Sequence, residues 1–322
     1  MKKKISLNFR TVLCFVILAA MGIFIALSDK LLDSVRSGLN LYVVAVLPSM
    51  LPFFFFSKLL TELGFAATAG SALKKPLSFL YGAPPASGYV LAMSMLCGYP
   101  VGAKLLAELY EGDCLASSDV KKVAAFTSTS GPLFIVGAVG VGMFENKTYG
   151  FILLLAHYIG TLLNGLIYRG KRSPQTVEPR LTINTDELLN KCMLNAFLSV
   201  GIVGGFIVIF NLAIDMLSLC GVMDVFGKVF GLSGRNLDFA SGVAGGLIEM
   251  TKGCLTISQL GLSHRVSLPI CEFLITFGGM SVTFQSLAFL SKTKISPALY
   301  LLQKFTQGIL CSVICFLLSL LI

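Results

Sequence analysis

Long apolar runs separated by short polar segments dominate the pattern along this chain. Five runs reach the roughly 20 apolar residues that a membrane-spanning helix needs: 11–28, 40–60, 148–168, 194–220 and 296–321. Two more, 123–144 and 266–290, are long enough but are interrupted by small residues, in TSTSGPLF (127–134) and TFGGMSV (276–282). The pattern predicts an all-α integral membrane protein with about seven transmembrane helices.

Two further apolar stretches, 77–111 and 237–262, are broken in the middle. In the first, Ala86–Cys97 would form a helix of about 18 Å and Val101–Glu111 one of about 16 Å, whereas the hydrocarbon core is about 30 Å thick. Each arm would reach the middle of the bilayer without crossing it. This favours either one broken span or a re-entrant helical hairpin with its tip at Gly98-Tyr99-Pro100.

The placement of basic residues decides between these two topologies. If both stretches are re-entrant hairpins, entering from opposite faces, 16 basic residues lie inside, six lie outside and Lys104, Lys252 and Lys304 lie within the membrane. If 77–111 crossed instead, RGKR (169–172) would move outside, against the preference of Lys and Arg for the cytoplasmic side. We therefore expect a cytoplasmic N-terminus in the cell membrane, with 1–34 forming an uncleaved first transmembrane helix.

The predicted topology contains an internal repeat. A unit at 35–168 and a unit at 192–322 flank a polar cytoplasmic linker at 169–191, and the two units have opposite orientations. A gapless shift of 148 residues places Lys104 on Lys252, Gly98 on Gly246, and Ser130-Gly131 on Gly278-Gly279. Inverted repeats with broken helices near the bilayer midplane are typical of secondary transporters.

Composition and charge narrow the function further. The chain is 55% hydrophobic and 13% charged, against about 25% charged in soluble domains. The net charge of +9 follows the topology and indicates no nucleic-acid partner. The nine cysteines are scattered without a C-x-x-C motif, which favours small apolar fillers over a disulfide framework or metal site. Without a phosphate-binding loop or hydrolase motif, we expect no enzyme and no cofactor, but gradient-driven or passive transport.

The broken backbone predicts where a substrate binds. Non-helical backbone at membrane depth is tolerated where it lines a cavity, and free helix N-termini favour anions. Lys104 and Lys252 lie within a turn or two of the hairpin tips. The predicted site is therefore an electropositive pocket for a small organic anion, formed by both lysines and four breaks: Gly98-Tyr99-Pro100, Ser128-Thr129-Ser130-Gly131-Pro132, Gly245-Gly246 and Gly278-Gly279.

A structural interpretation of the lysines stays open beside this one. Glu108 follows Lys104 by four residues and Glu249 precedes Lys252 by three, so that each lysine can be neutralised on its own helix face. Both interpretations hold if the glutamate is displaced by substrate or carries a coupling proton. We assign gating or coupling to Glu108 and Glu249, and to Pro100 and Pro132 at the breaks.

Other side chains near the breaks are weaker candidates. Ser128, Thr129 and Ser130 could bind substrate or cap helices, and Thr283 and Gln285 follow the second break. Tyr99 could stack on an aromatic substrate or lie at the membrane interface. His157 could relay protons, but its position in a span favours a packing role.

Four segments together resemble a known family: LPSMLPFFFFSKLL, CGYPVGAKLL, TSTSGPLFIVGAVGVGMF and GGLIEMTKGC. They are similar to the YlbJ-type sporulation integral membrane proteins, of the wider nucleoside-recognition (Gate) group, which is similar to concentrative nucleoside transporters. The resemblance covers about residues 35–320. It implies an inverted-repeat transporter fold and a role in endospore formation, in the membrane around the forespore, linked to passage of the aromatic dicarboxylate dipicolinate.

Three functions are compatible with the sequence. The first is transport of a small organic anion, for which the family implies dipicolinate. The second is nucleoside-type transport. The third is a structural or regulatory role in sporulation, without transport, in which the Lys–Glu pairs are structural. The lipid bilayer is the expected surrounding, and a homo-oligomer is compatible with each of the three.

Overall fold

The computed structural model describes residues 7–171, 187–222, 225 and 234–322, and every regular element in these ranges is a helix. This confirms the expected all-α class. The helices are α1 Leu7–Ala26, α2 Ser28–Leu41, η1 Tyr42–Val46, α3 Leu47–Glu62, α4 Phe65–Tyr81, α5 Ala86–Cys97, α6 Val101–Glu111, α7 Ser117–Thr127, η2 Leu133–Met143, α8 Lys147–Ile167, α9 Leu188–Leu219, α11 Arg235–Ile248, α12 Met250–Gln259, α13 His264–Phe277, α14 Gly279–Leu290 and α15 Pro297–Ser319.

Four helical segments of the described chain are long and apolar enough to cross a membrane: Lys147–Ile167, Leu188–Leu219, His264–Leu290 and Pro297–Ser319. They correspond to the predicted spans 148–168, 194–220, 266–290 and 296–321. A bent pair, Thr11–Ala26 and Ser28–Val44, brings the number to five if it counts as one span. The protein is therefore an integral membrane protein, and the further crossings stay predictions.

The other predicted spans differ in shape from the expectation. The first helix ends at Ala26, and the chain turns by 102° into the next one. The predicted span 40–60 begins much earlier, because α2, η1 and α3 form a continuous helical backbone from Ser28 to Glu62. The predicted span 123–144 is two separate helices, α7 and η2, on either side of the break at residues 128–132.

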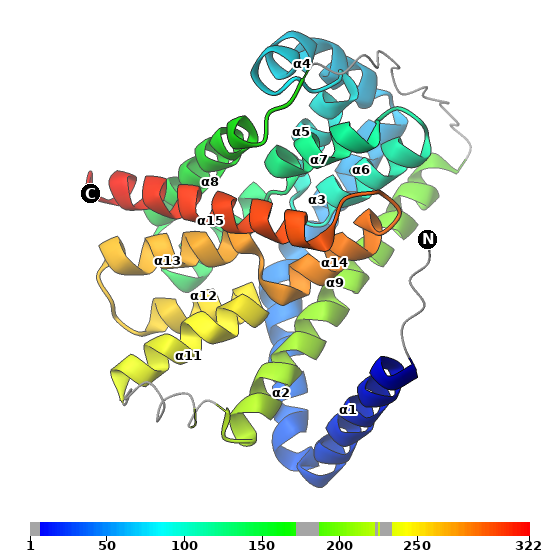
Figure 1. Cartoon of the computed structure of the whole chain (residues 1–322). Coiled ribbons are helices and arrows are strands. Elements are labelled where there is room, and N and C mark those ends of the chain that lie inside the picture. The colour runs from blue at the N-terminus through cyan, green and yellow to red at the C-terminus, as the bar shows by residue number, and fades with distance from the viewer. Residues whose placement is uncertain (1–6, 172–186, 223–224, 226–233) are drawn as a thin grey trace.

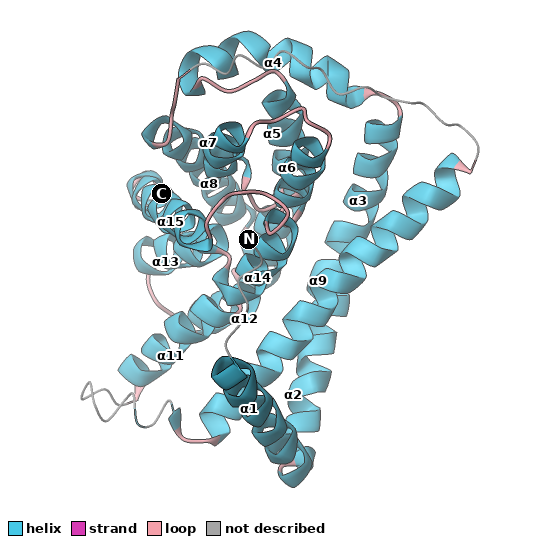
Figure 2. Ribbon diagram, turned by 45° about the vertical axis from the view of Figure 1, so that its right-hand side comes forward, coloured by secondary structure: helices cyan, strands magenta, loops and turns pink. Residues whose placement is uncertain are grey.

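Two long antiparallel helical segments, α2–η1–α3 and α9, form one layer of the molecule (Figure 2). The 32 residues of α9 extend over about 48 Å. Close packing holds the layer together: a Cβ on Gly204 would lie 2.6 Å from the Tyr42 ring, and one on Gly38 would lie 3.2 Å from the Val208 backbone. The Asn211 side chain also donates a hydrogen bond of 2.9 Å to the Ser34 carbonyl.

The second layer contains two helical hairpins, α5–α6 and α11–α12, at opposite ends of the view in Figure 1. The helix boundaries repeat with the spacing found in the sequence. Residues 101–111 of α6, shifted by 148, become 249–259, and α12 covers Met250–Gln259. Residues 147–167 of α8 become 295–315, and α15 covers Pro297–Ser319.

The tip of the second hairpin is not at Gly245-Gly246, as the sequence suggested. Both glycines lie inside α11, and the break is at Glu249, between Ile248 and Met250. The glycines instead allow close packing, because a Cβ on Gly253 would lie only 2.2 Å from the Gly246 Cα. Residues 172–186 of the predicted linker lie outside the described residues, and α9 already begins at Leu188.

Candidate functional site

Each hairpin tip packs against a broken helix of its own half of the chain. A Cβ on Gly98 would lie 2.3 Å from the Gly131 nitrogen, in the break between α7 and η2. In the second half, a Cβ on Gly279 would lie 3.0 Å from the carbonyl oxygen of Gly246 and of Ile248. Gly98 and Gly279 also have φ values of +78° and +63°, which glycine adopts with little strain. The two breaks of each half of the chain therefore lie next to each other.

A buried ammonium group joins the first break to the second half of the chain. Lys304 on α15 is 1% exposed, and its Nζ donates to the Tyr99 hydroxyl at 2.7 Å, the Ser128 carbonyl at 3.0 Å and Gln307 Oε1 at 3.1 Å. Three acceptors match the three N–H groups of an ammonium. The Gln307 amide also donates to the Ser128 carbonyl at 3.0 Å. Two side chains of α15 thus hold this carbonyl in place at the break.

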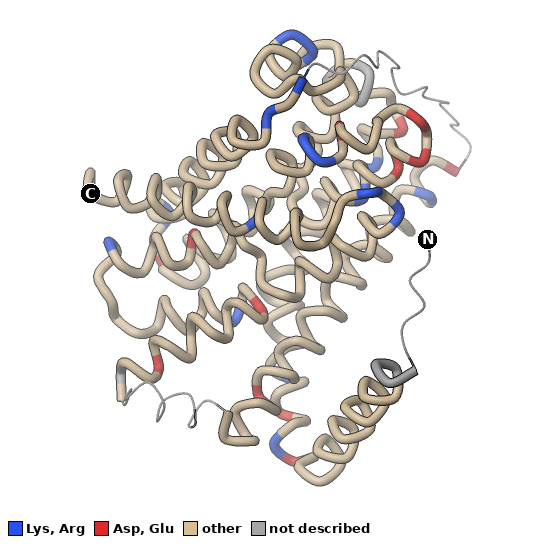
Figure 3. The backbone as a smooth tube through the Cα atoms, in the orientation of Figure 1, with Lys and Arg blue, Asp and Glu red and all other residues tan. Residues whose placement is uncertain are grey.

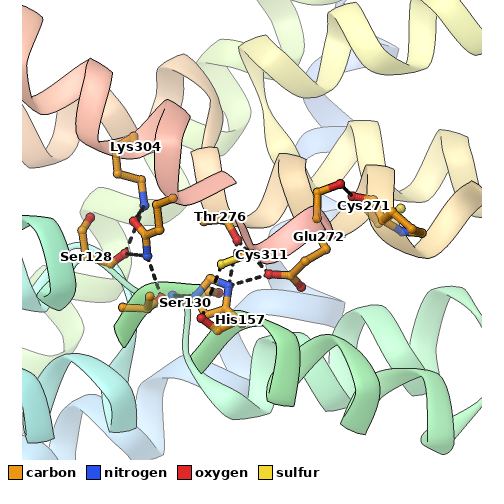
Figure 4. Close-up of polar contacts among 12 residues, drawn as sticks. Ser128, Ser130, His157, Cys271, Glu272, Thr276, Lys304 and Cys311 are labelled. Carbon is orange, nitrogen blue, oxygen red and sulfur yellow. Dashed lines mark hydrogen bonds and ion pairs between the residues drawn. The ribbon is translucent and has the colours of Figure 1, made fainter. Parts of the chain in front are cut away.

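The imidazole of His157 on α8 fixes the same break from the other side (Figure 4). Its Nε2 lies 2.9 Å from the Ser130 backbone nitrogen, and its Nδ1 lies 2.9 Å from both Glu272 Oε1 and Thr276 Oγ1. A backbone N–H can only donate, so Nε2 is the acceptor and the ring proton is on Nδ1. His157 is therefore part of a buried polar network and is not only a packing residue.

His157, Glu272 and Cys311 form a group whose potential metal-ligand atoms lie within 4.8 Å of one another. However, both imidazole nitrogens and Glu272 Oε1 already take part in hydrogen bonds within the protein. We therefore assign no metal to this group.

A small cavity lies where the two hairpin tips meet. Its volume is about 20 Å³, which is room for about one water molecule. Its polar lining comes from Tyr99 of the first tip, Glu249 and Thr251 of the second, and Ser281 and Gln285 of α14. Ser281 Oγ and Gln285 Oε1 are buried and have no hydrogen-bond partner among the described residues. The structure thus brings together three predicted site residues, Tyr99, Glu249 and Gln285.

Glu249 caps a helix and does not bind the ammonium of Lys252. Its Oε2 accepts from the Lys252 backbone nitrogen at 2.8 Å, and its Oε1 accepts from Thr251 Oγ1 at 3.0 Å. An acceptor side chain at this position satisfies a free N–H of the first helical turn. This explains why the hairpin breaks at Glu249. The Lys252 ammonium instead pairs with Asp215 on α9, which also accepts from the Ser34 hydroxyl.

Lys104 lines a different cavity, of about 50 Å³ between α3, α6 and α9. Within the described chain, its ammonium has neither an ion pair nor a hydrogen bond, and the expected pair with Glu108 does not form. The other polar residues lining this cavity come from all three helices: Ser57, Lys58, Thr61, Glu108, Asn195 and Ser199.

The expected common pocket for the two lysines is wrong. Lys252 lines a third cavity, of about 130 Å³, together with Asp215 and Ser218 of α9, whereas the Lys104 cavity reaches Ser199. Sixteen residues separate Ser199 from Asp215, which is about 24 Å along a helix. The hairpin tips meet in the middle, but the arms that carry the lysines lead in opposite directions from it.

The three cavities follow one side of α9. Residues that line them recur at intervals of about one helical turn, with Asn195 and Ser199 in the first cavity, Val203 and Ile207 in the second, and Ile214, Asp215 and Ser218 in the third. The row lies between α9 and the part of the molecule that carries the hairpins. It contains an ammonium group at each end and the buried carboxylate of Glu249 in the middle.

The remaining predicted residues have structural partners. Ser128 Oγ lies 2.8 Å from the Tyr300 hydroxyl, and Thr129 Oγ1 lies 2.8 Å from Ser94 Oγ. Ser130 contributes its backbone to the network, while its own hydroxyl has no partner in the described part of the chain. The hydroxyl of Thr283 is likewise buried without one. The other predicted positions lie in the breaks or at their edges: Pro100, Gly131, Pro132 and Gly278.

Sequence reasoning assigned no role to Lys304, Glu272 or Asp215, although all three contact site residues. A sequence feature could have identified them, because each is a charged residue inside an apolar segment. Such residues are rare in membranes and commonly mark a functional site.

One known protein matches the chain over most of its length. It is described as "Sporulation integral membrane protein YlbJ" from Bacillus subtilis (strain 168), and it is 32% identical over 316 residues, which cover 89% of this chain and 77% of that protein. No family model matches the chain. No solved structure matches it either.

Proposed function

The chain belongs to the YlbJ family of sporulation integral membrane proteins, and from this premise we propose that it transports a small organic anion across the membrane without acting as an enzyme. One observation carries the proposal: a row of three cavities, each with some polar side chains in its lining, along a single side of α9. The hairpin tips meet at the middle cavity, which is the arrangement expected of a substrate site at the midplane of an inverted-repeat transporter. Seven spans, with α5–α6 and α11–α12 as re-entrant hairpins, complete the proposed topology.

The ammonium groups at the two ends of the row favour an anion. Lys104 presents an ammonium without a partner among the described residues to a polar cavity, and an uncompensated charge in a membrane protein commonly serves a ligand. At the other end, Lys252 is paired with Asp215, so an anion can bind there only if this pair opens. Lys104 is thus the first contact of the substrate, and the Lys252–Asp215 pair acts as a gate.

Dipicolinate is the proposed substrate. Its two carboxylates suit a path with an ammonium at each end, and its aromatic ring suits the ring of Tyr99 at the middle cavity. The proposed setting is endospore formation, in a membrane that surrounds the forespore. Basic residues gather around α4 and the neighbouring turns in the upper half of Figure 3, which makes this the proposed cytoplasmic side.

Flux of radiolabelled dipicolinate in proteoliposomes tests the proposal. We expect Lys104→Gln to lower the initial rate at least about tenfold, equivalent to about 1.4 kcal/mol, and Lys104→Arg to retain most of it. Lys292→Gln is the matched control, because Lys292 is exposed and pairs with Glu111 on the surface. Full activity of a Lys104→Gln, Lys252→Gln double variant would contradict an anion path along α9.

The same assay distinguishes the alternatives. Wild-type protein that carries no dipicolinate but carries labelled uridine would indicate nucleoside-type transport. Wild-type protein that raises the flux of neither compound above that of empty liposomes, although it is folded, would favour a structural or regulatory role.

A further inference from the structure

We propose that His157 and Glu272 form a proton-binding site that couples proton movement to transport, an inference that rests on the transport function proposed above. Both side chains are 0% exposed. They come from different helices, α8 and α13, and meet the broken segment between α7 and η2 through the backbone nitrogen of Ser130. Histidine is the side chain that ordinarily changes its charge near neutral pH.

The hydrogen bonds define where a proton would bind. Nδ1 already carries the ring proton, so an added proton must bind Nε2. Nε2 now accepts from the Ser130 N–H across 2.9 Å, and after protonation two N–H groups would face each other there. The hydrogen bond would be lost and the two groups would repel each other. Proton binding therefore acts directly on the backbone of the break.

Glu272 is the acidic partner of His157 in this site. Its Oε1 lies 2.9 Å from Nδ1 of His157, and its Oε2 is buried without a hydrogen-bond partner in the described part of the chain. This carboxylate is therefore placed to attract a positive charge on the neighbouring imidazole.

Other charged and titratable groups around His157 make the binding reversible. The Lys304 ammonium also faces the network, through the Tyr99 hydroxyl and the Ser128 carbonyl, so a proton on His157 adds a second positive charge there. This excess charge favours release. The remaining titratable side chains near the network are hydroxyls and thiols, which ordinarily lose their proton only above neutral pH: Tyr99, Tyr158, Tyr300, Cys271, Cys311 and Cys315.

Residues from the other helices that pack on α8 do not change this balance. η2 contains no titratable residue. Tyr81 of α4 donates its hydroxyl to the Leu162 carbonyl, away from the imidazole. On α7, the charges of Asp119 and Lys122 pair with each other at 2.9 Å, at the end of the helix away from the break.

The tip of the first hairpin packs against the break between α7 and η2. This contact connects the proton site to the cavities along α9. Gly131, next to Ser130, packs on Gly98 so closely that a Cβ would lie 2.3 Å away. Tyr99, which follows Gly98, lines the cavity where the tips meet. Its hydroxyl donates to the Thr276 carbonyl at 2.9 Å, and the Thr276 side chain contacts both His157 and Glu272. A proton on His157 would thus release the tip that borders the middle cavity.

His157→Gln is the sharpest variant for a test. A glutamine places an amide oxygen near the position of Nε2, where it can accept from the Ser130 N–H but cannot take up a proton. His264→Gln is the matched control, because His264 is the second of the two histidines and its ring lies beside that of Tyr149, with the centroids 5.7 Å apart.

The experiment measures dipicolinate flux and lumenal pH together in proteoliposomes that contain a pH-sensitive dye. We expect dipicolinate flux through the wild type and His264→Gln to move protons, and its rate to change at least about fivefold when the pH gradient is reversed. We expect His157→Gln to lose both effects. Wild-type protein that carries dipicolinate without protons, or proton coupling that persists in His157→Gln, would overturn the proton site and leave the transport function standing.

Hydrogen–deuterium exchange of residues 127–132 gives a readout that needs no substrate. After correction for intrinsic exchange rates, we expect exchange at the break to increase as the pH falls in the wild type, and to stay constant in His157→Gln and Glu272→Gln. If dipicolinate flux is absent from every protein, the proposed function fails and this measurement alone decides on the proton site. Exchange that does not depend on pH in the wild type overturns it.

Discussion

At the scale of single residues, Lys304 is the side chain whose replacement should affect stability most. Lys304→Met keeps the apolar stem but leaves the Ser128 carbonyl, Gln307 Oε1 and the Tyr99 hydroxyl without their donor, and it removes the balancing charge near Glu272. Breaking a buried charged network costs about 3 kcal/mol. We expect a loss of this size in the free energy of unfolding, measured for detergent-solubilised protein.

The control for this substitution is Lys292→Met. Lys292 pairs with Glu111 at 3.1 Å, and both side chains are about half exposed, so the expected loss is below about 1 kcal/mol. Equal losses in the two variants would show that Lys304 is not the centre of a buried network.

The site residues that could be predicted from the sequence are those next to a helix break. The breaks at Gly98-Tyr99-Pro100 and at residues 128–131 are visible in the chain itself, and the structure places Tyr99, Ser128 and Ser130 in the network there. The partners of the lysines were not predictable in this way. Lys252 binds Asp215, 37 residues away, and no spacing rule within one helix points to such a contact.

At the scale of elements, the docking of the first hairpin tip depends on Gly98. Its φ of +78° and ψ of −166° belong to a region that glycine occupies almost alone, at a cost of about 1–3 kcal/mol for other residues. An added Cβ would also lie 2.3 Å from the Gly131 nitrogen. We expect Gly98→Ala to lower the midpoint of thermal unfolding and to reduce dipicolinate flux severalfold.

Gly137→Ala is the comparison for this variant. It adds the same methyl group inside η2, where the nearest atom of Leu133 lies 3.5 Å away, an ordinary contact. Alanine is also the better helix former by up to about 1 kcal/mol, so we expect unchanged or slightly higher stability. A Gly98→Ala variant that behaves like Gly137→Ala would contradict the tight docking of the tip.

Helix existence was easier to predict than the place of a break. The predicted bounds of α5 and α6 match the observed ones, because Gly98 and Pro100 end one helix and start the next. In the second hairpin the glycine pair at 245–246 drew attention to the wrong position. A helix tolerates glycine where another backbone approaches, and the actual break follows from a capping carboxylate, Glu249.

At the scale of the whole molecule, the division into two layers could not be predicted from the sequence. Hydropathy identified apolar segments, but it could not show that residues 28–62 form one continuous helix against α9, or that the cavities follow α9. Those features depend on contacts such as Asn211 with Ser34, which are 177 residues apart. The 148-residue spacing of the helical arms, by contrast, was visible in the sequence, whereas the inverted orientation of the two halves stays a prediction.

The topology itself can be tested by cysteine labelling. In a variant without the nine native cysteines, single cysteines at Lys75, Glu111, Arg265 or Lys294, all exposed positions, would be probed with a membrane-impermeant maleimide. If α5–α6 is a re-entrant hairpin, positions 75 and 111 lie on the same side. We expect both to react only in inverted vesicles, as Lys294→Cys does, because basic residues favour the cytoplasm.

Arg265→Cys, at the start of α13, should react in intact cells, because the 27-residue segment His264–Leu290 separates it from Lys294. Positions 265 and 294 serve as the internal standard, because they lie on opposite sides of the membrane if the segment His264–Leu290 crosses it. Opposite sides for positions 75 and 111 would make α5–α6 a crossing segment, invert every later helix and remove the inverted repeat. The cavities along α9 would then no longer lie between two equivalent halves, and the transport mechanism would lose its structural basis.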